Sequence, residues 1–207
     1  MKNSLPDFWS FNRVRDASLI KTENICWQGP FSWVGYEKEN DLETIPDISG
    51  VYLFTFEYKD GYILRSAGIT NSMKRRFSQH TREYKKGNYT VLDVEYAKKG
   101  IREEIWHGWQ YAKSHREEFL ENKDIILKYV EKELKAYRLF IGNINDKRKR
   151  ERIEFSIMLN IYSSKEPWAD LVDKGMALKG RYNNEIPIKV NNCCSHNLYG
   201  FPDVMEI

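Results

Sequence analysis

The chain has 207 residues, of which 41% are hydrophobic and 14% aromatic. This length and this content of large apolar side chains exclude a wholly disordered chain and are sufficient for a sizeable core. Lys and Arg number 33 against 30 Asp and Glu, so a formal charge of +3 does not by itself mark a nucleic-acid-binding protein, and the local distribution of charge must decide.

Two further properties bear on where the protein works. The sequence has no run of about 18 apolar residues, and its first residues are charged where a secretory signal peptide is apolar. We therefore expect a cytoplasmic protein without a membrane partner. The cysteines Cys26, Cys193 and Cys194 form neither an even disulfide set nor a paired CxxC motif. Adjacent Cys193 and Cys194 would strain a tetrahedral zinc site with His196, which we therefore disfavour.

The first third of the chain predicts a hairpin after an irregular lead-in. Residues 1–45 are rich in aromatic residues but are interrupted by Gly29-Pro30, so we expect a segment without a long regular element that wraps the core. A turn-rich stretch then precedes the β-branched and aromatic residues 51–56, which predict a strand. Asp60-Gly61 is a hairpin signal, and residues 62–67 predict the antiparallel partner.

A helix and an inserted layer follow the hairpin. Asn71 and Ser72 are candidate N-caps for a helix whose apolar positions recur at helical spacing up to Tyr84. Within 88–136, residues 91–97 are a possible strand and residues 101–134 carry long charged helical patterns studded with aromatic residues, and we interpret the whole as a helical insertion. Three aromatic residues of this insertion could stack on bases, but aromatic residues at helical spacing more often pack in a core, which we expect of Trp106, Trp109 and Tyr111.

The rest of the chain predicts one strand, one helix and an extended tail. Residues 137–141 favour a third strand because they are aromatic and branched. A helix is predicted from about 147 to 162, and residues 185–191 alternate in the manner of a strand. We expect a single domain over 1–207, with a core at 46–164, the insertion at about 88–136 and a C-terminal extension at 165–207.

Four short segments carry the residues on which a function can be based. Gly50-Val51-Tyr52 begins the first strand, Ser66-Ala67-Gly68 ends the second, Arg76 lies on the following helix, and Glu154 lies on the late helix. In this order the segments resemble the GIY-YIG nuclease superfamily, with the two tripeptides in place of its two namesake motifs. The resemblance covers residues 50–87 well and 137–164 more loosely.

The resemblance implies a fold and an activity. The implied fold is α+β, a small three-stranded antiparallel sheet flanked by helices, here with a helical insertion and terminal extensions. The implied activity is a DNA endonuclease that depends on one divalent ion, Mg²⁺ or Mn²⁺. In that family the equivalent of Tyr52 helps to activate water, that of Arg76 binds phosphate, and that of Glu154 holds the metal. His80, four residues after Arg76, resembles a histidine that takes part in catalysis in restriction-type members.

The residue types suit this chemistry. Hydrolysis of a phosphodiester requires a base for the attacking water, a cation for the charge that grows on the phosphate, and a metal for the leaving oxygen. Arg76 and His80 are four residues apart, so on a helix both can address one phosphate. Glu154 lies in the most apolar predicted helix, where a carboxylate is costly unless it is paired or bound to a cation.

Clustered cations indicate a surface for DNA, the expected partner. The late helix begins with four of them, Lys147, Arg148, Lys149 and Arg150, and the first helix carries Lys74 and Arg75 beside Arg76. If both helices face one cleft, this local basic surface can release counterions from DNA. An enzyme with one active centre needs two visits or two copies to break a duplex, which leaves a homodimer open.

Other interpretations stay open beside this one. Ser66 stands where the second motif has a tyrosine, so the chain could instead bind nucleic acid without cutting it, and the insertion at 88–136 could serve protein interaction. Tyr52 could be an ordinary strand aromatic, and Arg76 and His80 the edge of an amphipathic helix. Glu154 could form a surface ion pair with Arg150, four residues before it.

Overall fold

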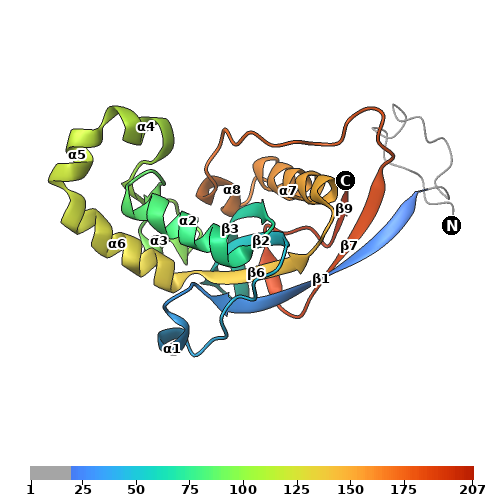
Figure 1. The fold of residues 1–207 in the computed structure, drawn as a ribbon, viewed down its shortest axis with the longest axis horizontal. Coiled ribbons are helices and arrows are strands. Elements are labelled where there is room, and N and C mark those ends of the chain that lie inside the picture. Colours follow the sequence, from blue (N-terminus) through green and yellow to red (C-terminus); the bar gives the residue numbers. More distant parts are fainter. Residues whose placement is uncertain (1–19) are drawn as a thin grey trace.

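The computed structural model describes residues 20–207, and these residues form an α+β fold around one large mixed sheet (Figure 1). The strand order in this seven-stranded sheet is β8-β3-β2-β6-β1-β7-β9. Strand β1 pairs in parallel with β7, and β3 with β8, whereas the other neighbours are antiparallel. The strands are β1 Lys21–Ser32, β2 Gly50–Tyr58, β3 Gly61–Thr70, β6 Arg138–Asn143, β7 Ile188–Cys194, β8 Asn197–Tyr199 and β9 Val204–Glu206.

The expected small three-stranded antiparallel sheet is therefore wrong. Its three strands exist as β2, β3 and β6, which are adjacent and antiparallel, but they form only part of a wider mixed sheet. We did not expect β1 from the sequence, because Pro30 lacks a backbone N–H and a proline usually argues against a strand. In the structure the pairing of β1 with β6 shifts register between Gln28 and Phe31, and this irregularity accommodates the proline. The part of the expected lead-in at 1–19 lies outside the described residues.

The hairpin of β2 and β3 forms where the sequence predicts it. Tyr58 pairs with Gly61, so Lys59 and Asp60 make a two-residue loop. Lys59 has a φ of 49°, as a tight hairpin turn of this length requires. Next to the hairpin, β6 pairs with β2 from Gly50 to Thr55.

Each face of the central strands contributes to its own apolar core. Along β2, Tyr52, Phe54 and Phe56 point to the core that includes residues of α2 (Met73–Lys85) and α6 (Lys123–Ala136). Val51 and Leu53 point to the core beneath α7 (Lys147–Tyr162). This alternation is the two-residue period of a strand with both faces covered. Helices α2 and α7 begin as predicted, with Ser72 and Asp146 as N-caps.

The insertion is mostly helical, and in Figure 1 its helices lie at the end of the molecule away from β7 and β9. It also contains a two-stranded sheet, so the predicted helical layer is incomplete. Its elements before α6 are β4 Val91–Leu92, α3 Val94–Ala97, β5 Glu104–Trp106, α4 Trp109–Ser114 and α5 Arg116–Glu121. The remaining short helices are α1 Glu37–Asn40 and α8 Trp168–Leu171. Across residues 20–207, the helices are too short or too polar to cross a membrane.

Candidate functional site

The structure brings the four predicted site residues to one place. The side chains of Tyr52, Arg76, His80 and Glu154 line a single cavity of about 80 Å³. The cavity also contacts Ser66 and Gly68 of β3. Strand β8 pairs only with Gly61–Ile63 of β3, so the following part of this edge carries no strand among the described residues. Side chains from both faces of the sheet can meet there.

Gly68 allows Tyr52 to reach this edge. Tyr52 and Gly68 are directly paired across β2 and β3. A Cβ atom at Gly68 would overlap the phenol oxygen and ring of Tyr52, so the phenol lies across the bare backbone of the glycine. A glycine in a strand often marks such a close approach. The last residue of the second tripeptide therefore has a steric role in placing the side chain of the first.

Helix α2 supplies two polar groups that contact the phenol. Arg76 Nε donates a hydrogen bond to Tyr52 Oη at 3.0 Å, and His80 Nε2 lies 2.8 Å from the same oxygen. Phe77, one position after Arg76, packs beneath Tyr52 and Phe54 with ring-centroid distances of 5.4 and 5.6 Å. The apolar stripe of α2 thus fixes the helix on the sheet, and Arg76 and His80 share the side that faces Tyr52.

Burial keeps the phenol and the imidazole neutral. Burial raises the pKa of Tyr52 to about 12, although the neighbouring charge of Arg76 acts in the opposite direction. Burial and then the charge of Arg76 lower the pKa of His80 to about 3. His80 is 6% exposed, and its Nδ1 atom has no hydrogen-bond partner within the described chain. At neutral pH the contact therefore joins two uncharged groups beside a permanent cation.

Glu154 approaches the cavity from α7, on the opposite face of the sheet from α2. Burial raises the pKa of its carboxyl group to about 7, against the attraction of Arg76. Among residues 20–207 the carboxylate has no hydrogen bond and no ion pair. The ion pair with Arg150 that we considered is absent, because Arg150 is buried and donates instead to Ser49, Asn71, Ile144 and Asn145.

A divalent ion fits the donor set of the cavity. No cluster of three or more His, Cys, Asp or Glu residues suited to a metal occurs in the described part of the chain. Mg²⁺ keeps several waters and takes one or two carboxylates together with phosphate oxygens. The partly buried and unpaired carboxylate of Glu154 matches that requirement.

The predicted basic surface is only partly exposed. Lys74, Arg75 and Lys147 are exposed. Arg148 Nε is 2.7 Å from Glu185 Oε1, and Lys149 Nζ is 2.7 Å from Glu23 Oε2. Together with the buried Arg150, these two residues hold α7 to neighbouring segments of the protein. Most of the positive charge at the start of α7 is therefore paired with carboxylates or buried, and only Lys147 of this group is exposed.

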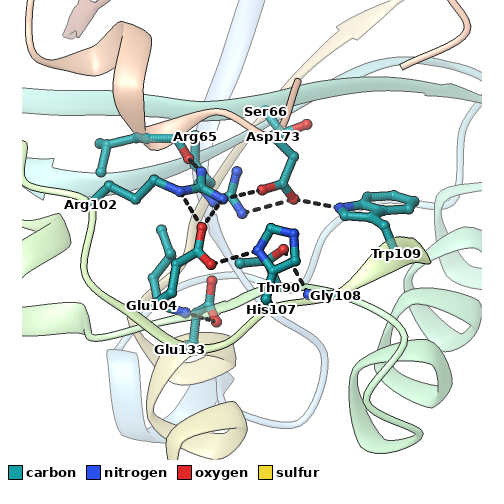
Figure 2. A network of polar contacts seen from close by, with 12 residues as sticks. Arg65, Ser66, Thr90, Arg102, Glu104, His107, Gly108, Trp109, Glu133 and Asp173 are labelled. Atoms are coloured by element: carbon teal, nitrogen blue, oxygen red, sulfur yellow. Dashed lines mark hydrogen bonds and ion pairs between the residues drawn. The ribbon is translucent and has the colours of Figure 1, made fainter. Parts of the chain in front are cut away.

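Sequence reasoning gave no role at the site to four other groups of the cavity. Arg65, Tyr89, Trp109 and Asp173 also line it. Asp173 Oδ2 accepts hydrogen bonds from Arg65 Nη2 at 3.1 Å and from Trp109 Nε1 at 2.8 Å, as Figure 2 shows. No motif indicated Asp173, because it lies in the C-terminal extension and comes to the cavity only through folding. Two of the four have a signal in the sequence: Arg65 directly precedes the second tripeptide, and Trp109 is among the aromatic residues considered for base stacking.

The aromatic residues of the insertion divide into two kinds. Trp106 is 4% exposed and donates its indole N–H to Gly87, as a core residue does. Trp109 is 47% exposed, so the expectation that it belongs to the core is wrong. Tyr111 is half-buried and packs against Trp106 with ring centroids 5.7 Å apart. The three cysteines are free thiols, and none of them lines the cavity that Tyr52 and Arg76 share.

The geometry defines an α+β protein with a cavity at the edge of its central strands that aromatic and charged side chains line together. Comparisons of the chain with protein-family models, curated proteins and solved structures found no match. The function is therefore argued from the residues that meet in the cavity.

Proposed function

We propose that the protein is a divalent-metal-dependent endonuclease that hydrolyses phosphodiester bonds in DNA. The observation that carries this proposal is the phenol of Tyr52, which contacts both Arg76 and His80 in the cavity that Glu154 also lines. A phenol with an imidazole, a guanidinium and an unpaired carboxylate can supply the base, the cation and the metal ligand that the hydrolysis of a phosphodiester uses.

The hydrogen bonds indicate a direction for proton transfer. Because Arg76 Nε donates to Tyr52 Oη, the phenol hydrogen can be donated to His80 Nε2. His80 Nε2 is then the acceptor, and the ring carries its hydrogen on the buried Nδ1. A water that attacks phosphorus can give its proton to Tyr52 while Tyr52 passes its own proton to His80. A phosphate bound beside His80 would favour the imidazolium and so raise the pKa of the ring from about 3.

Arg76 and Glu154 have separate roles in this scheme. Arg76 keeps its positive charge and, while it orients the phenol, can bind a non-bridging phosphate oxygen. Glu154 is the residue that would hold the divalent ion. When bound, such an ion supplies Lewis-acid stabilisation of the phosphate and of the leaving oxygen.

Conversion of supercoiled plasmid to the nicked form tests the proposal. The protein is incubated with plasmid and Mg²⁺ or Mn²⁺, and the variants Arg76→Ala and Glu154→Ala are compared with it. Arg82→Ala and Glu117→Ala are matched controls, because both residues are exposed and neither lines the cavity. We expect metal-dependent nicking that the first pair abolishes and the controls retain. Nicking that survives both cavity substitutions would show that cleavage does not depend on this cavity and would refute the proposal.

A second candidate is a domain that binds nucleic acid without cutting it, and Ser66 favours it. Because residue 66 is a serine, the second tripeptide contributes no phenol to the cavity. The hydroxyl of Ser66 donates to the carbonyl of Ala67 at 3.4 Å. Binding to DNA that weakens steeply with salt, without nicking in either metal, would support this candidate in place of the enzyme.

A further inference from the structure

Trp109 combines an exposed ring with an unfavourable backbone conformation. It is the first residue of α4 and has a φ of 58°, a region that bulky side chains rarely adopt. The residue is 47% exposed, so burial does not account for keeping a tryptophan at this position. A strained residue that persists in a folded protein often marks a functional site.

Two contacts fix the orientation of the indole ring. Its Nε1 atom donates to Asp173 Oδ2 at 2.8 Å, and Asp173 also binds Arg65 and Arg102 (Figure 2). The ring packs on Tyr89 with centroids 5.0 Å apart and planes at 36°. The indole is therefore anchored at one edge and supported by a second ring, although the residue is 47% exposed.

This anchored ring lies beside the groups that we assign to phosphodiester hydrolysis. Trp109 and Tyr89 line the same cavity as Tyr52, Arg76 and Glu154. Tyr89 connects the two regions, because its ring centroid is 5.6 Å from that of His80 and 5.0 Å from that of Trp109. A nucleotide whose phosphate contacts Arg76 would therefore have an aromatic surface within reach of its base.

We propose that Trp109 is a stacking platform for a nucleobase next to the phosphodiester that the protein cuts. This inference rests on the proposed function and specifies its substrate: DNA that presents an unstacked base, either as a single strand or at a locally opened site. Stacking on an aromatic side chain tolerates any base, because every base has a π-face. A ring that is already fixed in place loses little conformational freedom when a base binds to it.

Binding to single-stranded oligonucleotides tests the platform independently of cleavage. A fluorescently labelled thymidine oligonucleotide and an abasic oligonucleotide of equal length are titrated with the protein in EDTA, and anisotropy is recorded. The variants are Trp109→Leu and Trp109→Phe. The matched control is Tyr96→Leu, since Tyr96 is 46% exposed on α3 and does not line the cavity. Circular dichroism confirms that each variant is folded.

We expect Trp109→Leu to bind the thymidine oligonucleotide about 5- to 150-fold more weakly, the range that loss of one base-stacking contact gives. Trp109→Phe should lose less affinity, and Tyr96→Leu should bind normally. The specific signature is discrimination: the wild-type protein should prefer thymidine over abasic DNA, and Trp109→Leu should lose that preference. A purely structural role of Trp109 would weaken binding to both oligonucleotides equally.

Three results would overturn the platform: equal affinity of the wild-type protein for both oligonucleotides, unchanged discrimination in Trp109→Leu, or no binding by the wild-type protein. Failure of the endonuclease proposal looks different. A protein that discriminates through Trp109 but never nicks plasmid in Mg²⁺ or Mn²⁺ would refute cleavage and would leave the platform as part of a binding site.

Discussion

Tyr52 Oη lies 2.8 Å from His80 Nε2, and Arg76 Nε lies 3.0 Å from the same oxygen. These three groups come from β2 and from successive turns of α2, and the apolar contact of Phe77 with Tyr52 holds them in register. Burial leaves Tyr52 protonated and His80 unprotonated at neutral pH, so the pair shares one mobile proton. Arg76 Nε donates to the phenol oxygen, which leaves the phenol hydrogen free to point at His80, and the charge of Arg76 acts to lower the pKa of both groups.

Removal of the phenol oxygen is the most direct test of this arrangement. Tyr52→Phe keeps the ring that packs on Phe54 and Phe77 but removes the acceptor for Arg76 and the partner of His80. We expect the nicking rate under single-turnover conditions to fall about 100- to 10,000-fold, the usual contribution of positioned acid–base groups. The free energy of unfolding should fall by about 1–3 kcal/mol, since two polar partners lose a hydrogen bond.

The control for this substitution is Tyr62→Phe. Tyr62 is half-buried on β3 near Phe140 and His196, and its phenol does not line the cavity. It should nick at the wild-type rate. If Tyr52→Phe also nicked at that rate, the phenol would have no part in proton transfer.

Gly68→Ala tests whether the glycine of the second tripeptide places the phenol. The added methyl would occupy the position of Tyr52 Oη, so Tyr52 must move away from His80 and Arg76. We expect nicking to fall to the level of Tyr52→Phe, and the double variant to lose nothing further, because both changes disable one unit. Rates that multiply in the double variant would instead show that Gly68 acts independently of Tyr52.

The sequence predicts the local elements of this site better than the sheet that surrounds it. The hairpin, α2 and α7 follow from short-range signals such as Asp60-Gly61 and the N-cap Ser72. The pairing of β1 with β7 depends on contacts between chain segments far apart, for example Ile25 with Asn192, and no local pattern specifies it. For this reason the sequence predicts the three central strands β2, β3 and β6 correctly but does not predict the wider sheet to which they belong.

The same limit of local signals applies to the cavity. Tyr52, Arg76 and Glu154 were predicted from ordered motifs, whereas Asp173 reaches the cavity from a segment without a recognisable pattern. Trp109 was assigned to the core because helical spacing cannot distinguish a buried aromatic residue from one at the rim of a cavity. Both its left-handed backbone conformation and its exposure are seen only in the structure.

The raised pKa of Glu154 predicts how metal use depends on pH. Its carboxyl group, with a pKa of about 7, must lose its proton before it can bind a cation. We expect the Mn²⁺ concentration for half-maximal nicking to rise up to about tenfold for each pH unit below 7, and to level off above it. His80→Asn should lower the rate but keep this dependence, because the pKa of His80 is about 3. A metal requirement that is independent of pH would contradict the assignment of Glu154.

Glu154 should also reduce the stability of the metal-free protein at high pH. The unfolded chain releases this proton near its ordinary value of about 4.3, whereas the folded protein holds it until about 7. The free energy of unfolding therefore decreases as pH rises between these values. In EDTA, Glu154→Gln should be about 1–3 kcal/mol more stable than the wild type near pH 8 and equal to it near pH 4. Urea unfolding at pH 4 and pH 8 measures this difference in stability. Equal stability of the two proteins near pH 8 would show that burial of the Glu154 carboxylate has no energetic cost.

The two groups of cations should respond differently to substitution. Lys74 and Arg75 are exposed on α2 beside Arg76, so each change to Ala should weaken DNA binding and reduce the slope of log affinity against log salt by about 0.9. Arg150 is buried and donates to Ser49 and to two backbone carbonyls, so Arg150→Met should mainly lower the free energy of unfolding, by about 1–3 kcal/mol for each buried acceptor left unsatisfied. Salt-dependent anisotropy and urea unfolding separate the effects. A normal salt slope after loss of both Lys74 and Arg75 would mean that DNA does not cross the exposed end of α2.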